Sequence, residues 1–202
     1  MAAMKRGILG GTFDPVHRAH LDLAECAQEQ LGLAAILWIP AGEPWRKKGR
    51  KIAPAKHRVA MLELTVEREP TWSVSSIELE RTGPTYSVDT LEQLREQHKG
   101  DNFTLVMGQD ALEDLPNWHN PEQLIQLAAL AVAVRGERRQ TGRELEALLP
   151  GLSKRVTWLD MPQLPFSATQ VRTLASQGTP LVGFVPAPVD AYIREHRLYG
   201  AS

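Results

Sequence analysis

Cysteine is almost absent from this sequence, because Cys26 is the only one among 202 residues. A single thiol cannot form a disulfide within the chain, which excludes the class of small domains held together by disulfides. Long apolar runs are missing as well. No stretch approaches the roughly 18 apolar residues of a membrane-spanning helix, and the first residues lack the apolar core of a secretory signal. We therefore expect a cytoplasmic protein that does not bind membranes.

Net charge is also scarce, since 23 basic residues are balanced by 24 acidic ones. The whole molecule therefore lacks the basic excess that attracts nucleic acid. The basic run at residues 46–51 is a local exception, but apart from Trp45 it has no interleaved aromatic residues and it matches no nucleic-acid-binding module. We expect no nucleic acid as a partner. With 43% hydrophobic residues, the chain can bury one sizeable core, so residues 1–202 are expected to form a single domain.

Hydrophobic periodicity alternates between strand and helix along the chain. Short apolar runs indicate buried strands, alternation of apolar and polar residues indicates short strands at residues 72–75 and 77–79, and apolar residues at helical spacing indicate the helices between them. The expected strands cover residues 5–10, 35–40, 72–75, 77–79, 103–107, 130–134 and 156–159. The expected helices cover residues 21–31, 55–68, 88–98, 121–127, 144–149, 168–177 and 187–196. This order predicts an α/β fold, a Rossmann-like doubly wound parallel sheet with helices on both faces and ligands at the carboxyl ends of its strands.

The strongest local pattern is residues 10–20, GGTFDPVHRAH, which join the first expected strand to the first expected helix. Adjacent glycines let backbone amides approach a phosphate closely, and a helix N-terminus adds partial positive charge. His17 and His20 are three residues apart, so both imidazoles face the same side if the helix begins near them. The pattern predicts a phosphate site. A zinc site on the same pair is an alternative, but no cysteine or further histidine lies close by in the sequence.

A second phosphate-binding pattern lies where the helix at residues 168–177 is expected to start. Ser167 has the position of an N-cap. The amides of the first turn, the Thr169 hydroxyl and the Arg172 guanidinium together form a donor set suited to a polyphosphate. Capping serines followed by arginine are common, so this segment alone favours an ordinary helix cap.

Taken together, the two patterns resemble the nucleotidyltransferases that carry an H-x-G-H signature, with Ala19 at the position of its glycine. Residues 166–172, FSATQVR, resemble the I-S-S-T-x-I-R segment of that superfamily, which holds the β and γ phosphates of ATP, and Ala168 removes one of its hydroxyls. The resemblance is closer to the bacterial nicotinate-nucleotide adenylyltransferases and runs from Gly10 to Tyr199. The segments that carry it are GPTYSVDTL at 83–91, GQD at 108–110, LPNWH at 115–119 and a VP, YI and LY ending at 185–199.

The resemblance implies transfer of AMP from ATP to the 5′-phosphate of nicotinate mononucleotide, which gives nicotinate adenine dinucleotide and pyrophosphate in NAD biosynthesis. Magnesium is implied as the companion of ATP, without a metal site of the protein's own. The implied catalytic residues are His17, His20, Lys47 and Arg172. The implied ATP-binding residues are Gly10, Gly11, Thr12, Phe13, Asp110, Ser167, Thr169 and Arg172. The implied mononucleotide-binding residues are Thr85, Tyr86, Trp118, Arg46 and Lys47.

Several of these residues have a physical rationale of their own. The indole face of Trp118 can stack on a pyridine ring, although core packing explains it as well. Thr85 can hydrogen-bond a nicotinate carboxylate, and Asp110, just past a strand end, can accept a bond from a ribose hydroxyl or cap a helix. The basic loop departs from the family, since P-P-H-K is expected where this chain has PWRK at residues 44–47. Arg46 then replaces a histidine with a permanent charge, and a solvated charge run is the ordinary alternative.

Other interpretations stay open at this stage. An adenylyltransferase acting on nicotinamide mononucleotide or on phosphopantetheine would use the same phosphate chemistry. A non-catalytic ATP-binding regulatory domain would use the same glycine turn, although simple binding does not require two imidazoles directed at one phosphate. A homo-oligomer is neither required nor excluded by the sequence.

Overall fold

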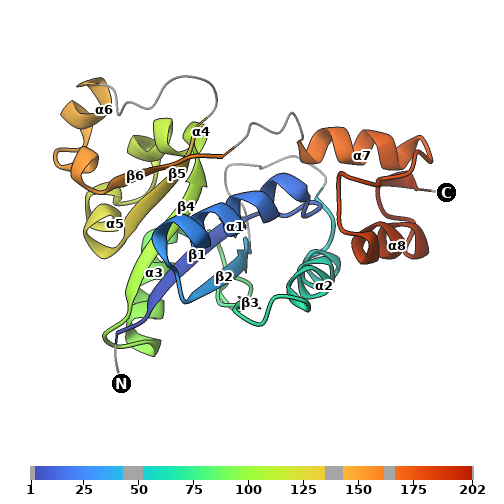
Figure 1. Ribbon diagram of the computed structural model, residues 1–202, viewed down its shortest axis with the longest axis horizontal. Coiled ribbons are helices and arrows are strands. Elements are labelled where there is room, and N and C mark those ends of the chain that lie inside the picture. The colour runs from blue at the N-terminus through green and yellow to red at the C-terminus, as the bar shows by residue number, and fades with distance from the viewer. Residues whose placement is uncertain (1–2, 43–51, 135–142, 162–166, 202) are drawn as a thin grey trace.

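A computed structural model describes residues 3–42, 52–134, 143–161 and 167–201. In these residues one parallel sheet has the strand order β3-β2-β1-β4-β5-β6 (Figure 1). The strands are β1 (Lys5–Gly11), β2 (Ala35–Pro40), β3 (Trp72–Val74), β4 (Asn102–Gly108), β5 (Ala129–Ala133) and β6 (Val156–Leu159). Strand order runs outward in one direction from β1 to β3 and in the other from β4 to β6. The reversal between β1 and β4 is the place where such sheets open a ligand crevice.

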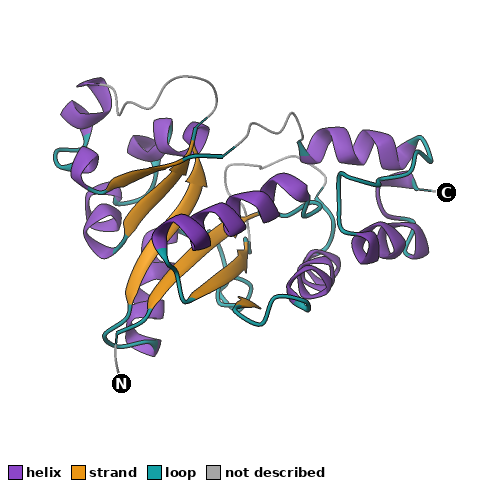
Figure 2. Cartoon of the chain, viewed as in Figure 1, coloured by secondary structure: helices purple, strands orange, loops and turns teal. Residues whose placement is uncertain are grey.

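Helices connect these strands and cover both faces of the sheet (Figure 2). They are α1 (Arg18–Leu31), α2 (Ala55–Val66), α3 (Ser87–Gln97), α4 (Gln109–Glu113), α5 (Pro121–Leu127), α6 (Arg143–Leu148), α7 (Ala168–Ser176) and α8 (Ala187–Glu195). Short 3₁₀ turns are η2 (Leu115–Asn117), η3 (Leu152–Lys154) and η4 (Leu198–Gly200). The predicted fold class is therefore confirmed. Figure 1 shows α7 and α8 together at one end of the molecule, with α2 as their neighbour.

The core consists of two hydrophobic clusters, one on each face of the sheet. Neighbouring residues of one strand belong to opposite clusters, as Leu9 and Ile8 in β1 show. The first cluster takes residues from α1, α2, α7 and α8, and the second takes residues from α3, α4 and α5. Burial on both faces explains the apolar runs of the inner strands, whereas the edge strands β3 and β6 include polar residues and are only partly buried.

Two details of the sequence prediction need correction. Residues 77–79 were expected as a strand but form a turn, in which the Leu79 amide donates to the Ser76 carbonyl over 2.8 Å. The alternation there reflects burial of Ile77 and Glu78 within a turn, because three residues are too few to separate the two patterns. Helix α4 was not predicted, since five residues cannot display a helical period. Among the described residues, no helix has the length and apolar character to cross a membrane.

Candidate active site

The glycine turn leaves β1 at the reversal point of the sheet and leads into α1. A methyl group built on Gly10 would meet no protein atom within 4 Å, so open space borders this backbone. Phe13 anchors the far side of the turn. Its side chain is buried and its φ of 49° lies in the left-handed region, which costs a non-glycine residue free energy unless packing compensates. The Phe13 ring packs against the Trp38 ring at a centroid distance of 5.6 Å, and this contact helps to fix the conformation of the turn.

The histidine pair lies directly after this turn. His17 is the N-cap residue of α1, and its ring stacks on that of His20 with centroids 3.8 Å apart and planes inclined by 24°. The expectation that both imidazoles face one side of the helix start is therefore confirmed. The backbone amide of His17 donates to Nδ1 of His20 over 3.2 Å. Because Nδ1 accepts this bond, neutral His20 carries its proton on Nε2.

Burial keeps His17 neutral near physiological pH. The residue is 6% exposed, and the loss of water around its ring lowers its pKa to about 4. Its own backbone hydrogen bond opposes this shift without reversing it. Nδ1 of His17 is fully buried, so the loss of water outweighs that hydrogen bond.

Asp14 connects the glycine turn to the C-terminal part of the chain. Its carboxylate accepts hydrogen bonds from the Tyr199 hydroxyl at 2.8 Å and from the Ala53 amide at 3.1 Å. Its carbonyl oxygen accepts a 2.7 Å bond from Nη1 of Arg172, which also lies 3.8 Å from the carboxylate. Burial, and then the negative charge of Asp14, raise the pKa of Tyr199, so the phenol remains a donor. The roles of Asp14 and Tyr199 were not predicted from the sequence, since their partners are distant in the chain.

The Arg172 contacts bring the second phosphate-binding pattern beside the first. Ser167 caps α7 by accepting a 3.2 Å bond from the Gln170 amide, so the ordinary cap interpretation is correct for its side chain. The Thr169 hydroxyl accepts a 3.1 Å bond from Nη2 of Arg172. Both Ser167 and Thr169 are exposed at the start of the helix. A single guanidinium thus joins the exposed start of α7 to the residue that follows Phe13.

The predicted mononucleotide residues come from two further connections. Thr85 is buried and Tyr86 half-buried just before α3, while Trp118 follows η2. The rings of Tyr86 and His119 stack with centroids 4.2 Å apart, which brings the two segments together. Trp118 is half-buried against the second core cluster, and its Nε1 donates to Asp114 over 3.3 Å. Packing against the core therefore explains why part of the indole is buried. The stack of Tyr86 on His119 was not predicted from the sequence.

Asp110 is exposed in the first turn of α4, immediately after β4. Since β4 pairs with β1, Asp110 and the glycine turn lie at the same edge of the sheet. Arg46 and Lys47 lie outside the described residues.

Comparison with known proteins identifies the family of this chain. The model of the cytidylyltransferase-like family matches residues 8–174. A protein of Thermomicrobium roseum, named as a probable nicotinate-nucleotide adenylyltransferase, is 39% identical over 96% of this chain and 90% of its own length. A protein of the same name from Roseiflexus is 40% identical over 98% of this chain and 100% of its own length. The chain belongs to the cytidylyltransferase-like family and, within it, to the nicotinate-nucleotide adenylyltransferases.

The fold of this adenylyltransferase family recurs in a solved structure at much lower sequence identity. Plasmodium falciparum nicotinic acid mononucleotide adenylyltransferase, complexed with NaAD, superposes with a TM-score of 0.80 over 98% of both chains at 18% identity. At that identity the likeness shows a shared fold.

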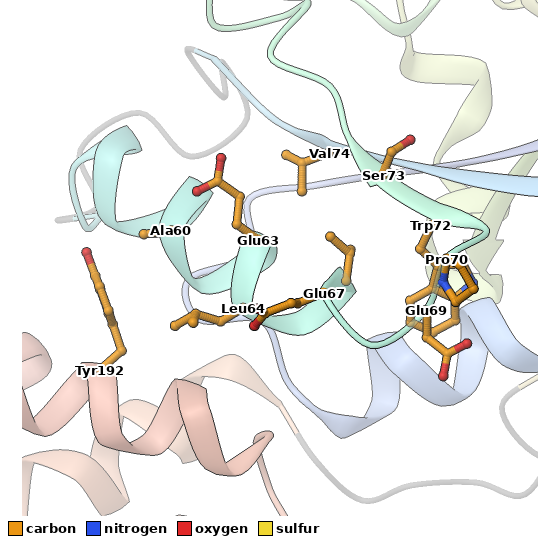
Figure 3. A pocket seen from close by; sticks show the side chains of 11 residues that line it. Ala60, Glu63, Leu64, Glu67, Glu69, Pro70, Trp72, Ser73, Val74 and Tyr192 are labelled. Carbon is orange, nitrogen blue, oxygen red and sulfur yellow. The ribbon is translucent and has the colours of Figure 1, made fainter.

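A groove between α2, β3 and α8 lies away from these residues (Figure 3). Glu63 and Glu67 on α2, Trp72 and Val74 on β3, and Tyr192 on α8 belong to its lining. None of the described residues that the sequence predicted for substrate binding lines this groove, which opens at the outer edge of the sheet.

The low pKa of His17 predicts a pH-dependent stability. The unfolded side chain takes up a proton near pH 6.5 and the folded one near pH 4, so stability is fully present above pH 6.5 and decreases below it. Between pH 7 and 5, the wild type should lose about 2 kcal/mol more unfolding free energy than His17→Asn, by linkage. Urea unfolding of both proteins at each pH measures this difference. Parallel losses in the two proteins would contradict the assignment.

Proposed function

We propose that this chain transfers the AMP group of ATP to the 5′-phosphate of nicotinate mononucleotide. An oxygen of the mononucleotide phosphate attacks the α-phosphorus, the bond to the bridging oxygen of the β-phosphate breaks, and pyrophosphate leaves. The observation that carries this proposal is the contact of Arg172 with the Asp14 carbonyl, because it places two phosphate-binding patterns side by side. The names of the relatives and the NaAD complex of the Plasmodium protein support the choice of acceptor.

The triphosphate site is proposed to consist of neutral donors at one end and a cation at the other. Gly10, Gly11, Thr12 and Phe13 supply backbone amides, and His17 and His20 supply imidazole nitrogens. Because His20 accepts at Nδ1, its Nε2 proton is the donor that can meet the α-phosphate. Ser167 and Thr169, at the start of α7, are proposed to bind the β and γ phosphates. Arg172 has five N–H donors, so its bonds to Asp14 and Thr169 leave others for phosphate.

No covalent intermediate is required by this arrangement. Catalysis comes from orientation and from donors placed where negative charge increases, as in other phosphoryl transfers. Mg²⁺ is proposed to enter the site bound to ATP. The Asp14 carboxylate already accepts hydrogen bonds from Tyr199 and Ala53, and the other groups of the proposed triphosphate site are mainly hydrogen-bond donors. Phosphate oxygens and water are the ligands that Mg²⁺ commonly keeps in such sites. Its chemistry is neutralisation of the leaving pyrophosphate.

The mononucleotide is proposed to occupy the neighbouring site of Thr85, Tyr86 and Trp118. The partly exposed indole offers a face for the pyridine ring, and the threonine offers a hydroxyl for the nicotinate carboxylate. Asp110 is proposed to accept a bond from an ATP ribose hydroxyl. Arg46 and Lys47 are proposed as phosphate-binding cations on the basis of the sequence.

The acceptor is tested by mixing the purified protein with Mg²⁺, ATP and one acceptor at a time. Nicotinate mononucleotide should yield pyrophosphate and a dinucleotide at a higher kcat/KM than nicotinamide mononucleotide, and phosphopantetheine should yield neither product. Chromatography of the dinucleotide and an enzymatic pyrophosphate assay measure the outcome. Pyrophosphate release with none of the three, despite ATP binding, would favour the regulatory-domain hypothesis.

His20→Asn separates the donor role of His20 from its structural bond. The asparagine Oδ1 can replace Nδ1 as acceptor for the His17 amide, whereas the Nε2 donor is lost. Loss of one preorganised donor should lower kcat by about 10²–10³-fold while ATP binding, measured by calorimetry, changes little. His98→Ala is the matched control, because His98 follows the C-terminal end of α3. Turnover near the wild-type value in His20→Asn would remove this imidazole from the reaction.

Trp118→Ala tests whether the indole binds the pyridine ring. If it does, the KM for the mononucleotide should increase about tenfold, as loss of one aromatic contact implies, while the KM for ATP changes much less. Trp118→Phe should recover most of the affinity, since it keeps a ring and loses only the bond to Asp114. Steady-state kinetics with each substrate varied in turn decides, and equal effects on both substrates would mean that Trp118 only packs the core.

A further inference from the structure

Arg58 in α2 is a buried cation whose hydrogen bonds to the described part of the chain all go to main-chain oxygens. It is 3% exposed, and each of its three side-chain nitrogens donates to a carbonyl. Nη1 donates to Thr12 at 2.9 Å, Nη2 to Ala41 at 2.9 Å, and Nε to Ala53 at 3.1 Å. The guanidinium therefore connects three separate points of the backbone.

Stability alone is a weak reason for such a residue. Removing a charge from water costs several kcal/mol, and well-packed apolar residues often replace buried charges without loss. Burial lowers the pKa of Arg58, while the negative charge of Asp14 opposes the shift, so the group stays protonated. The hydrogen bonds and Asp14 offset the cost of burial.

The three carbonyls belong to the chain segments that border the proposed phosphate site. Thr12 closes the glycine turn, Ala41 follows β2, and Ala53 precedes α2. Ala53 also donates its amide to Asp14, the residue that Arg172 holds. Lys47 and Arg46 lie in the sequence between Ala41 and Ala53.

Binding a carbonyl also determines the direction of the next amide. In a trans peptide the C=O and the following N–H point in opposite directions. With the Thr12 oxygen held toward Arg58, the Phe13 amide is directed away from Arg58, and the same holds for the Gly42 amide after Ala41. An arginine on one side of the backbone can thus fix the direction of amide donors on the other side.

We propose that Arg58 is a positioning residue for adenylyl transfer, which acts by holding the carbonyls of Thr12, Ala41 and Ala53. The proposal rests on the function proposed above. Arg58 contacts no substrate; by holding the Thr12 and Ala41 carbonyls it orients the amides of Phe13 and Gly42, and it ties the residue before α2 to both. Preorganised donors of this kind need no rearrangement during the reaction.

Arg58→Lys is the first test, because lysine keeps the charge but cannot reach three carbonyls with one ammonium group. We expect kcat to fall about 10²-fold, the effect of a displacement of about 1 Å in a reacting site. Calorimetric ATP affinity and the far-UV circular dichroism spectrum should change little. The matched control is Arg95→Lys, because Arg95 also donates to a carbonyl, that of Leu127, but on the exposed surface of α3. That variant should keep the wild-type kcat.

Chemical rescue is the second test. Arg58→Ala leaves a space of guanidinium shape, and added methylguanidinium should restore kcat in a saturable manner while methylammonium should not. The proposal is overturned if Arg58→Lys has the wild-type kcat and KM, or if activity falls only in proportion to the folded fraction. Wild-type turnover is measured first, and an inactive wild type refutes the proposed function. If the wild type is active and the Arg58 variants have the same activity as the wild type, only the inference about Arg58 is refuted.

Discussion

The contact between Arg172 and Asp14 is the constraint on which the proposed site depends. Asp14 lies in the turn after β1, Arg172 lies in α7, and Tyr199 near the C-terminus binds the same aspartate. Without these bonds, the start of α7 would have no polar connection through Asp14 to the glycine turn. Since the aspartate is buried, its carboxylate requires partners, and that requirement orders the surrounding segments.

The histidine pair illustrates how the same packing sets chemical character. His17 is buried next to an apolar core that contains Phe13 and Trp38, so its charged form is disfavoured. Its backbone amide fixes the tautomer of His20. Burial therefore determines the charge of one imidazole of the pair, and a backbone hydrogen bond determines the orientation of the other.

Much of the fold could be predicted from the sequence, because local patterns carry it. Apolar runs mark the inner strands of the described sheet, and the glycine turn follows β1 at the carboxyl ends of the strands, where sheets of this kind bind ligands. The segment predicted as a strand at residues 77–79 is a turn, and the short helix α4 was not predicted. Neither segment is long enough for a strand or helix period to appear in the sequence. The candidate residues at the two phosphate patterns were also found from local spacing, with the help of a family resemblance that the comparisons confirm.

What the sequence by itself determined is the alternation of strands and helices and the identity of the family, and it supplied the hypothesis that two helix starts bind phosphate. What only the tertiary structure decided is which of these segments meet. Asp14 with Tyr199, Tyr86 with His119, and Arg58 with three carbonyls are contacts between residues far apart in the chain or with main-chain atoms. Such contacts leave no periodic signal, because a hydrogen bond to a backbone oxygen places no requirement on the side chain of its partner. They arise when the sheet orders the segments, and the chemistry of the site follows from that order.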